Sequence, residues 1–292
     1  MSISNTETVP VTVLLAVRNE AANLERCLRA LAPAQRVFVI DSGSTDQTVV
    51  IAAASGAVVH QFHHEGGYPK KRQWALENLE FPTEWVLMLD ADEVVPEQLW
   101  VEISRVVQSL EVHSGYLIRK GFHFLGHRMK LGGFSHQAVL LVRAGKARFE
   151  QLIEVPGDTL DMEVHERVIV DGPVGVLTTP LIHEDFKGLE SYIDKHNRYS
   201  TWEAHLRYRL LSTGRYGSES VEPKLFGNAQ ERRRWLKRLA VRMPGEPLLW
   251  FLYHFVFRLG FLEGRPGFIA SQIRAQYIAN VRAKVFELRQ QR

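Results

Sequence analysis

The chain has 292 residues, of which 45% are hydrophobic and 24% charged, an ordinary balance for a folded globular protein. It contains one cysteine, Cys27, so an internal disulfide is excluded, and this usage fits a reducing compartment. No run of about 20 uncharged apolar residues occurs, which argues against a membrane-spanning helix. The length suffices for one large α/β domain with an appendage, or for two small domains.

The N-terminal segment is expected to be a disordered leader over residues 1–9 that runs into a strand. No basic stretch precedes the first apolar run, and that run ends at Arg18, so the pattern does not indicate a signal peptide.

Residues 10–110 alternate between short apolar runs and stretches with helical periodicity. Such alternation predicts an α/β fold with a mostly parallel sheet covered by helices on both faces. Ligands then bind at the carboxyl ends of the strands. The expected strands are 11–17, 37–41, 57–60 and 85–90, and the expected helices are 21–31, 45–55 and 70–79.

The second part of the chain has a different pattern. Residues 111–185 contain strand-like pieces between glycine-rich turns, which predicts a mixed or antiparallel extension of the sheet. A long helix is expected from Leu189 to Leu210, so that 10–211 forms the catalytic domain, with halves at 10–110 and 111–211. Residues 212–230 are rich in Gly, Ser and Pro and predict a linker, and 231–292 form a separate basic tail.

Acidic and polar residues follow three of the predicted strands. Asp41 ends one strand, and Asp90 and Asp92 end another. In an extended chain, residues i and i+2 point the same way, so Asp90 and Asp92 present two oxygen ligands together. Such oxygens suit Mg²⁺ or Mn²⁺ shared with a diphosphate. The alternative is that these side chains, and Asp46 above all, cap the following helix.

The segments VTVLLAVRNE, VFVIDSGSTDQT and WVLMLDADE resemble the nucleotide-binding half of the family 2 glycosyltransferases, and their order and spacing match across about residues 10–100. Later segments, among them GGFSHQAVLLVRAGKARF, SYIDKHNRYS and GFLEGRPGF, resemble the lipopolysaccharide-core glucosyltransferase branch. The resemblance implies a GT-A fold and inverting, metal-dependent transfer from a nucleotide-sugar. It also implies a UDP donor, glucose as the transferred sugar, and a lipid-linked or lipopolysaccharide-core saccharide as acceptor.

The resemblance assigns roles to individual residues. Glu20 matches the position beside the base and ribose, and Asp41 matches the aspartate that binds the base. Arg72 matches a basic residue near the nucleotide, although Lys71 and Gln73 replace its usual neighbours. The expected nucleotide-sugar ligands are Val17, Asn19, Glu20, Asp41, Arg72, Asp90 and Ala91, and the expected metal ligand is Asp92. His183, by its place one strand later, is expected as a second metal ligand; the alternatives are a donor contact and a hydrogen-bonded core residue.

An inverting transfer needs a carboxylate that takes the proton from the acceptor hydroxyl. Many members of the family carry Glu-Asp at this point, whereas this chain has His165-Glu166, as in the related branch. Glu166 is therefore the expected base, with Glu163 and Asp161 as rivals. The structural alternative is that Glu166 pairs with Arg167 or another cation.

Residues 231–292 carry 13 Lys and Arg against 4 Asp and Glu, a net +9, while the rest of the chain carries −6. Cations and aromatic residues are interleaved over 231–242, and an apolar stretch from Leu248 to Leu262 suits a helix lying in a membrane interface. We expect a peripheral enzyme on the inner face of the cytoplasmic membrane. The alternative is a solvated basic face beside a helix that packs on the main domain.

Two other classes compete with a glycosyltransferase. A sugar nucleotidyltransferase calls for a glycine-rich phosphate loop after the first strand, where this chain has AVRNEAAN. A nucleic-acid-binding module would use the basic tail but leaves the strand-end carboxylates unexplained, since acidic clusters repel phosphate. We therefore expect no nucleic-acid partner.

Overall fold

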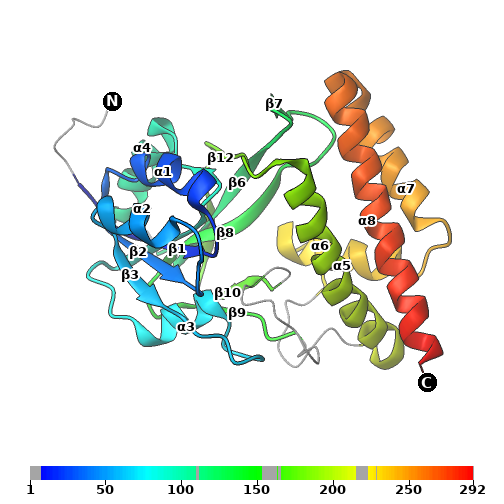
Figure 1. The fold of residues 1–292 in the computed structure, drawn as a ribbon, viewed down its shortest axis with the longest axis horizontal. Coiled ribbons are helices and arrows are strands. Elements are labelled where there is room, and N and C mark those ends of the chain that lie inside the picture. Colours follow the sequence, from blue (N-terminus) through cyan, green and yellow to red (C-terminus); the bar gives the residue numbers. More distant parts are fainter. Residues whose placement is uncertain are drawn as a thin grey trace.

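The protein has a sheet half and a helical half that lie side by side (Figure 1). The computed structural model describes residues 8–109, 112–152, 163, 166–214, 223–227 and 229–291. The N-terminal strand β1 begins at Val9 in the sheet half, and the C-terminal helix α8 runs along the outer, helical half. The predicted α/β class is confirmed.

The predicted elements of the sheet half are present, with small shifts at their ends. Its strands are β1 (Val9–Val17), β2 (Ala34–Asp41), β3 (Val58–Gln61), β4 (Trp85–Asp90), β5 (Glu93–Val94), β6 (Gly115–Phe124), β7 (His127–Arg128), β8 (His136–Arg143), β9 (Ala147–Phe149), β10 (Val168–Val170), β11 (Val174–Val176) and β12 (Leu181–His183). Its helices are α1 (Ala21–Arg29), α2 (Thr48–Ala54), α3 (Lys71–Asn78) and α4 (Glu97–Val107).

The main sheet runs in the order β3-β2-β1-β4-β8-β6-β12-β5. The strands from β3 to β4 are parallel, as the alternation of strands and helices predicts. Strand β8 is antiparallel to both β4 and β6, so the second part of the chain adds the mixed extension. The short strand β5 follows β4 in the chain, yet it pairs with β12 at the other end of the sheet order.

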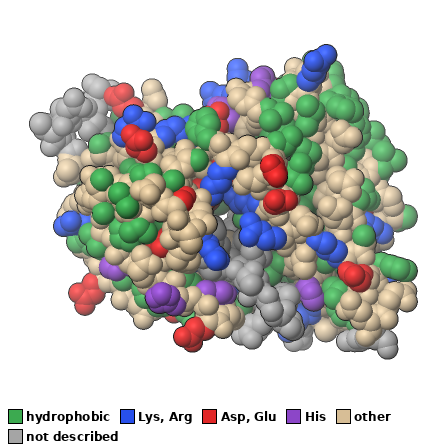
Figure 2. Space-filling view, viewed as in Figure 1, with side chains coloured by type: hydrophobic (Ala, Val, Ile, Leu, Met, Phe, Trp, Pro, Cys, Tyr) green, Lys and Arg blue, Asp and Glu red, His purple; other side chains and the backbone are tan. Residues whose placement is uncertain are grey.

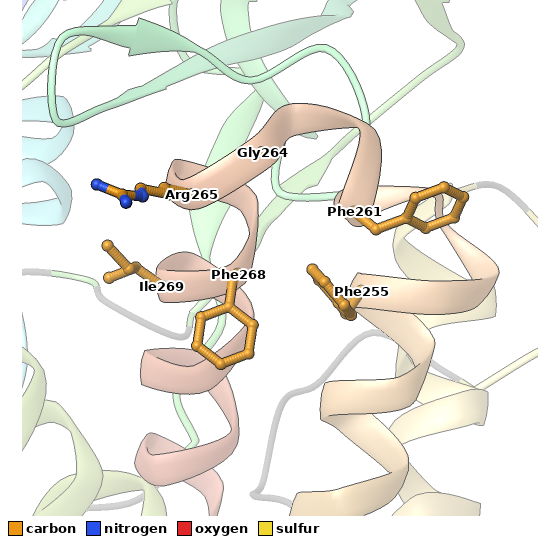
Figure 3. A pocket seen from close by; sticks show the side chains of 6 residues that line it. All are labelled: Phe255, Phe261, Gly264, Arg265, Phe268 and Ile269. Atoms are coloured by element: carbon orange, nitrogen blue, oxygen red, sulfur yellow. The ribbon is translucent and has the colours of Figure 1, made fainter.

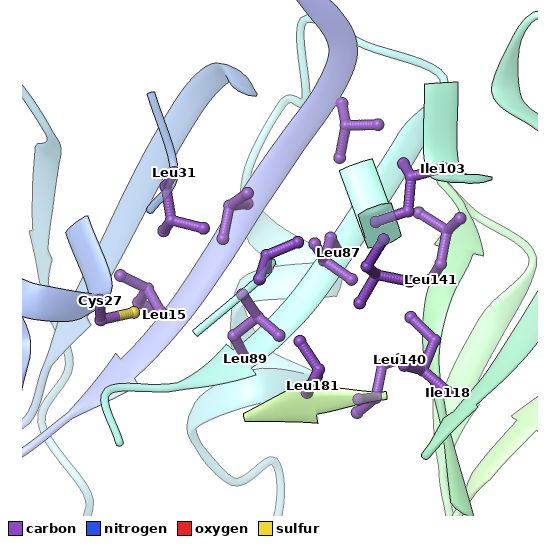
Figure 4. Packing of buried hydrophobic residues seen from close by; sticks show 14 of the residues in the cluster. Leu15, Cys27, Leu31, Leu87, Leu89, Ile103, Ile118, Leu140, Leu141 and Leu181 are labelled. Carbon is purple, nitrogen blue, oxygen red and sulfur yellow. The ribbon is translucent and has the colours of Figure 1, made fainter. Parts of the chain in front are cut away.

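Two apolar layers cover the sheet. Helices α1, α2 and α4 pack on one face, where Leu15 and Leu87 meet Cys27 and Ile103 (Figure 4). Helix α3 covers the other face together with side chains of β9 and β10. Because both faces of β1 are covered, its side chains are nearly all buried, which explains a continuous apolar run rather than an alternating one.

The helical half consists of α5 (Gly188–Thr213), α6 (Ala229–Ala240), α7 (Glu246–Leu252) and α8 (Gly264–Gln290), and the long helices α5 and α8 lie side by side (Figure 1). Of the predicted linker 212–230, residues 215–222 and 228 lie outside the described residues. The single helix expected from Leu248 to Leu262 is wrong. Leu259 takes a left-handed backbone with φ of 59°, and the stretch breaks into α7, the π-helix η1 (Tyr253–Phe257) and the 3₁₀ turn η2 (Gly260–Glu263).

A buried ionic cluster joins the helices of this half. The guanidinium of Arg207 on α5 donates to both carboxylate oxygens of Glu246, at 2.9 and 2.8 Å, and to Glu203 at 2.9 Å. Glu203 also accepts from Tyr277 of α8 and pairs with Lys237 of α6. The basic tail therefore packs against α5 through specific contacts.

The GFLEGRPGF segment anchors the helical half to the sheet half. Glu263 pairs with His127 of β7 at 2.6 Å and accepts the backbone N–H of Lys130 at 2.7 Å. Gly260 and Gly267 allow η2 to lie directly on α8, because a Cβ on Gly267 would come within 2.0 Å of the carbonyl oxygen of Gly260. The glycines of this segment thus have a packing role.

Candidate active site

The ends of three parallel strands meet at one edge of the sheet. Val17 of β1 pairs with Asp41 of β2, and the preceding Ala16 pairs with Asp90 of β4. The predicted clustering of the strand-end residues is therefore present in the structure. The backbone contributes too, since the carbonyl of Val17 accepts a hydrogen bond of 2.6 Å from Lys71 of α3.

Asp90 lies between two cations. Its carboxylate accepts from the guanidinium of Arg72 and forms an ion pair of 3.0 Å with Lys120 of β6. Burial would raise the pKa of Asp90, but Arg72 and Lys120 outweigh it and hold this pKa well below its usual value. Burial would likewise lower the pKa of Lys120, but Asp90 and Glu93 raise it. Asp90 is therefore ionised and oriented by its neighbours.

Asp92 and His183 form the second pair of the site. The Nε2 atom of His183 lies 3.3 Å from Oδ2 of Asp92. Burial raises the pKa of Asp92, but His183 opposes it and the net shift lowers this pKa to about 2. The other oxygen, Oδ1, is buried without a hydrogen-bond partner in the described part of the chain.

These two residues fit a divalent cation in part. An ionised carboxylate with one free oxygen and an adjacent imidazole are suitable ligands. No group of three His, Cys, Asp or Glu side chains arranged to hold a metal is found among the described residues. Because Mg²⁺ and Mn²⁺ sites of nucleotide enzymes take further oxygens from phosphate and water, two protein ligands suffice for such a site.

The polar residues expected around the base and ribose hold the loops at the strand ends in place. Asn19 accepts the backbone N–H of Thr45 at 2.8 Å, which joins the ends of β1 and β2. Asp41 accepts backbone N–H groups of Gly43 and Ser44, each at 3.1 Å, so it stabilises its own turn. Glu20 pairs with Lys187 at 2.6 Å, at the start of α5. In the structure these three polar side chains order the loops at the strand ends.

Glu166 is buried, and Lys70 and Tyr68 hold its carboxylate. It pairs with Lys70 at 3.2 Å and accepts a hydrogen bond of 2.8 Å from the hydroxyl of Tyr68. Glu163 accepts the backbone N–H groups of Arg72 and Gln73, at 3.3 and 3.0 Å, at the beginning of α3. Both carboxylates thus brace the segment before α3. The third expected candidate, Asp161, lies outside the described residues.

Two basic residues of the site, Lys120 and Lys195, were not identified from the sequence. Lys120 interrupts the apolar strand GYLIRKGFHF, and a charge inside a buried strand is the signal that identifies it. His136 faces Lys120 across the β6–β8 ladder. Lys195 comes from α5; burial would lower its pKa, but Tyr199 and the two aspartates of the site, Asp92 and Asp90, raise it.

The α/β fold and the strand-end carboxylates form a candidate active site, and comparison with known proteins narrows the class of enzyme. Residues 12–113 match the model of glycosyl transferase family 2. This range holds the three strand ends, Arg72 and the Asp90–Asp92 segment. The predicted resemblance to the family 2 glycosyltransferases is confirmed.

Several relatives match almost the whole chain, among them the following two. The lipopolysaccharide core biosynthesis glycosyltransferase LpsC of Rhizobium meliloti is 25% identical over 286 residues, which cover 96% of this chain and 93% of the relative. An uncharacterised glycosyltransferase of Rickettsia bellii is 26% identical and covers 92% of this chain and 83% of its own length. The similarity to the lipopolysaccharide-core branch therefore extends beyond the nucleotide-binding half.

Among solved structures, the chain is similar to glucosyl-3-phosphoglycerate synthase of Mycobacterium tuberculosis in complex with Mn²⁺, UDP and glucosyl-3-phosphoglycerate. The identity is 24% and the TM-score 0.31, over 41% of this chain and 46% of the other.

Proposed function

We propose that the protein is an inverting, metal-dependent glycosyltransferase that moves a sugar, glucose on the strength of the resemblance, from a UDP-sugar to a saccharide acceptor of lipopolysaccharide-core type. The observation that carries the proposal is the pair of neighbouring carboxylates at the strand ends. Asp90 is neutralised by Arg72 and Lys120, while Asp92 keeps a buried oxygen without a hydrogen-bond partner in the described residues.

The site has one group of residues for the diphosphate of the donor and another group for its nucleoside. Asp92 and His183 would hold Mg²⁺ or Mn²⁺, which neutralises charge on the departing diphosphate. Arg72, Lys120 and Lys195 add positive charge around the same carboxylates and orient the phosphates. The turns of Asn19, Glu20 and Asp41, with the backbone of Val17 and Ala91, would line the nucleoside. A donor bound across the strand ends follows the general rule for open α/β sheets.

Glu166 is the proposed base. In an inverting transfer it accepts the proton of the acceptor hydroxyl as that hydroxyl attacks the anomeric carbon from the face opposite the diphosphate. The ion pair with Lys70 holds the Glu166 carboxylate in place. For the transfer, the carboxylate has to exchange the hydroxyl of Tyr68 for that of the acceptor.

The helical half is proposed to bind an anionic membrane on the cytoplasmic side. Exposed hydrophobic side chains gather over this half (Figure 2), among them Phe257 at 76%, Leu248 at 63% and Leu262 at 61% exposure. A pocket between η1, η2 and α8 is lined by Phe255, Phe261 and Phe268, and the rings of Phe255 and Phe268 meet edge to face (Figure 3). Among the described residues, no helix is long and apolar enough to cross a membrane. Apolar area beside a net charge of +9 is the composition of a peripheral surface.

Turnover of a nucleotide-sugar panel tests the proposal. We expect release of UDP from a UDP-sugar in the presence of a core saccharide, loss of this release with EDTA, and recovery with Mn²⁺ or Mg²⁺. Release of pyrophosphate from UTP and a sugar phosphate would instead identify a nucleotidyltransferase.

A further inference from the structure

Three arginines from three elements of the helical half act electrostatically on one another or on the same neighbour, His254, and have no carboxylate partner among the described residues. They are Arg233 of α6, Arg258 between η1 and η2, and Arg274 of α8. None of them forms an ion pair with an acidic side chain of the described residues, whereas Lys237 pairs with Glu203 and Arg282 with Glu246. Burial, together with the charges of Arg274 and Arg258, lowers the pKa of Arg233.

A column of stacked rings fixes the position of these arginines. Phe134 stacks on His254 with ring centroids 4.8 Å apart, and His254 stacks on Trp250 at 5.4 Å. The guanidinium of Arg274 lies 5.6 Å from the ring of Trp250 on the same column, and 5.3 Å from Tyr277. Arginine stacked on aromatic rings is restrained without losing its hydrogen-bonding edge.

The loop before β8 contacts Arg258 beside the same column of stacked rings. The backbone N–H of Gly132 donates to the carbonyl of Arg258 at 2.8 Å. Gly133 has no side chain where the Arg258 side chain passes, since a Cβ there would lie 2.9 Å from its Nε. His254 also contacts the carbonyl of Gly132 at 2.6 Å through Nδ1. The loop and the helical half are thus built around the Arg258 side chain.

The arginine cluster is connected to the candidate active site. Burial, followed by the charges of Lys120 and Arg233, holds the pKa of His136 well below its usual value, so Arg233 lies within electrostatic range of His136. His136 is opposite Lys120, the partner of Asp90. On the ring side, Phe122 contacts both Phe134 and His183. These ring contacts thus lead from His183 to the loop that holds Arg258.

We infer that Arg233, Arg258 and Arg274 form a subsite for a phosphate group carried by the acceptor. Arginine forks match phosphate oxygens, and several guanidiniums without carboxylates leave charge that a dianion neutralises. The inference rests on the proposed function, because it names a chemical feature of the acceptor. The phosphate is carried either by a soluble saccharide or by a lipid.

Binding of inorganic phosphate tests the subsite without turnover. Calorimetric titration at constant ionic strength should show binding to the unmodified protein. The triple variant Arg233→Gln, Arg258→Gln, Arg274→Gln should bind at least about tenfold weaker, since each lost charged hydrogen bond costs about 1.5 kcal/mol or more. The control triple Arg232→Gln, Arg238→Gln, Arg242→Gln removes the same charge from other exposed positions of the helical half and should bind as the unmodified protein does. Equal phosphate binding by both triples would overturn the inference.

Competition identifies the source of the phosphate. Glucose 6-phosphate, or vesicles containing phosphatidic acid, should displace inorganic phosphate from the unmodified protein and not from the cluster variant. Displacement by the sugar phosphate alone identifies a soluble saccharide, and displacement by the vesicles identifies a lipid. Displacement by neither overturns the inference. UDP binding with Mg²⁺ should be the same in both triples, so a failure of the donor site is recognised separately.

Discussion

Asp92 and His183 are 91 residues apart in the chain, yet their side chains lie 3.3 Å apart because β12 pairs with β5. In that pairing His183 is opposite Glu93, directly after Asp92. The backbone N–H of Glu184 also donates to the carbonyl of Asp92 at 2.9 Å. The second part of the chain therefore completes a site that begins at the end of β4.

Replacing Lys120 with Met should destabilise the protein. Lys120 is the buried cation between Asp90 and Glu93, and removing one partner of a buried pair leaves uncompensated charge. We expect the free energy of unfolding, measured with urea at pH 7, to fall by about 3 kcal/mol or more. The exposed pair of Arg148 and Asp171 is the matched control, and Arg148→Met should cost less than about 1 kcal/mol. Similar losses in both variants would contradict the account of Lys120.

Replacing Glu166 with Gln should reduce turnover by roughly 10²–10⁴-fold and leave UDP binding unchanged, because the amide keeps the shape but cannot take a proton. Glu163→Gln is the matched control. Glu163 binds two backbone N–H groups through its two different oxygens, and the amide oxygen of Gln can still accept one of them, so turnover should persist. Unchanged turnover in Glu166→Gln would move the base to Glu163 or Asp161, and loss of UDP binding would place Glu166 in the donor site.

Acidification should destabilise the helical half through His254. Burial lowers the pKa of His254 to about 4, while an unfolded chain has a histidine pKa of about 6.5. Below about pH 6.5 the unfolded chain therefore binds a proton that the folded protein does not bind. The free energy of unfolding then decreases as the pH is lowered. This group alone should remove roughly 2 kcal/mol of unfolding free energy between pH 8 and pH 5.

The variant His254→Phe can stay in the ring column and no longer titrates. We expect its free energy of unfolding to decrease less on acidification than that of the unmodified protein, with a difference of roughly 2 kcal/mol. The exposed His63→Phe controls for removal of one histidine. If His254→Phe and the unmodified protein show the same pH dependence of urea unfolding, His254 does not carry this effect.

The residues of the site that could be predicted from the sequence are those whose positions follow from local sequence patterns. Buried runs followed by Asp41 and by Asp90 predict strand ends, and parallel pairing brings them to one edge. Lys120 and Lys195 were missed because their place depends on the register of β6 and the packing of α5. The apolar stretch after Leu248 predicted one helix, but the close approach of Gly260 to the His254 carbonyl and the left-handed Leu259 break it.

Vesicle binding should depend on both charge and apolar area. Vesicles with anionic lipid should bind the protein, and added salt should weaken the binding without abolishing it, since only the electrostatic part is screened. The variant Leu248→Ser, Phe257→Ser, Leu262→Ser removes exposed apolar area and should bind less at high salt. A triple at exposed positions of the sheet half, Val50→Ser, Val58→Ser, Val176→Ser, is the control. Equal binding to neutral and anionic vesicles would contradict the electrostatic part of the account.

The most direct test of the donor site is calorimetric titration with UDP, in the presence of Mn²⁺ and in the presence of EDTA. The account predicts that the unmodified protein binds UDP at least about tenfold more tightly with the metal, because Asp92 holds it against the diphosphate. Asp92→Asn should lose this difference, and the exposed control Glu97→Gln should keep it. UDP affinity that is the same with Mn²⁺ and with EDTA in the unmodified protein would contradict the central claim.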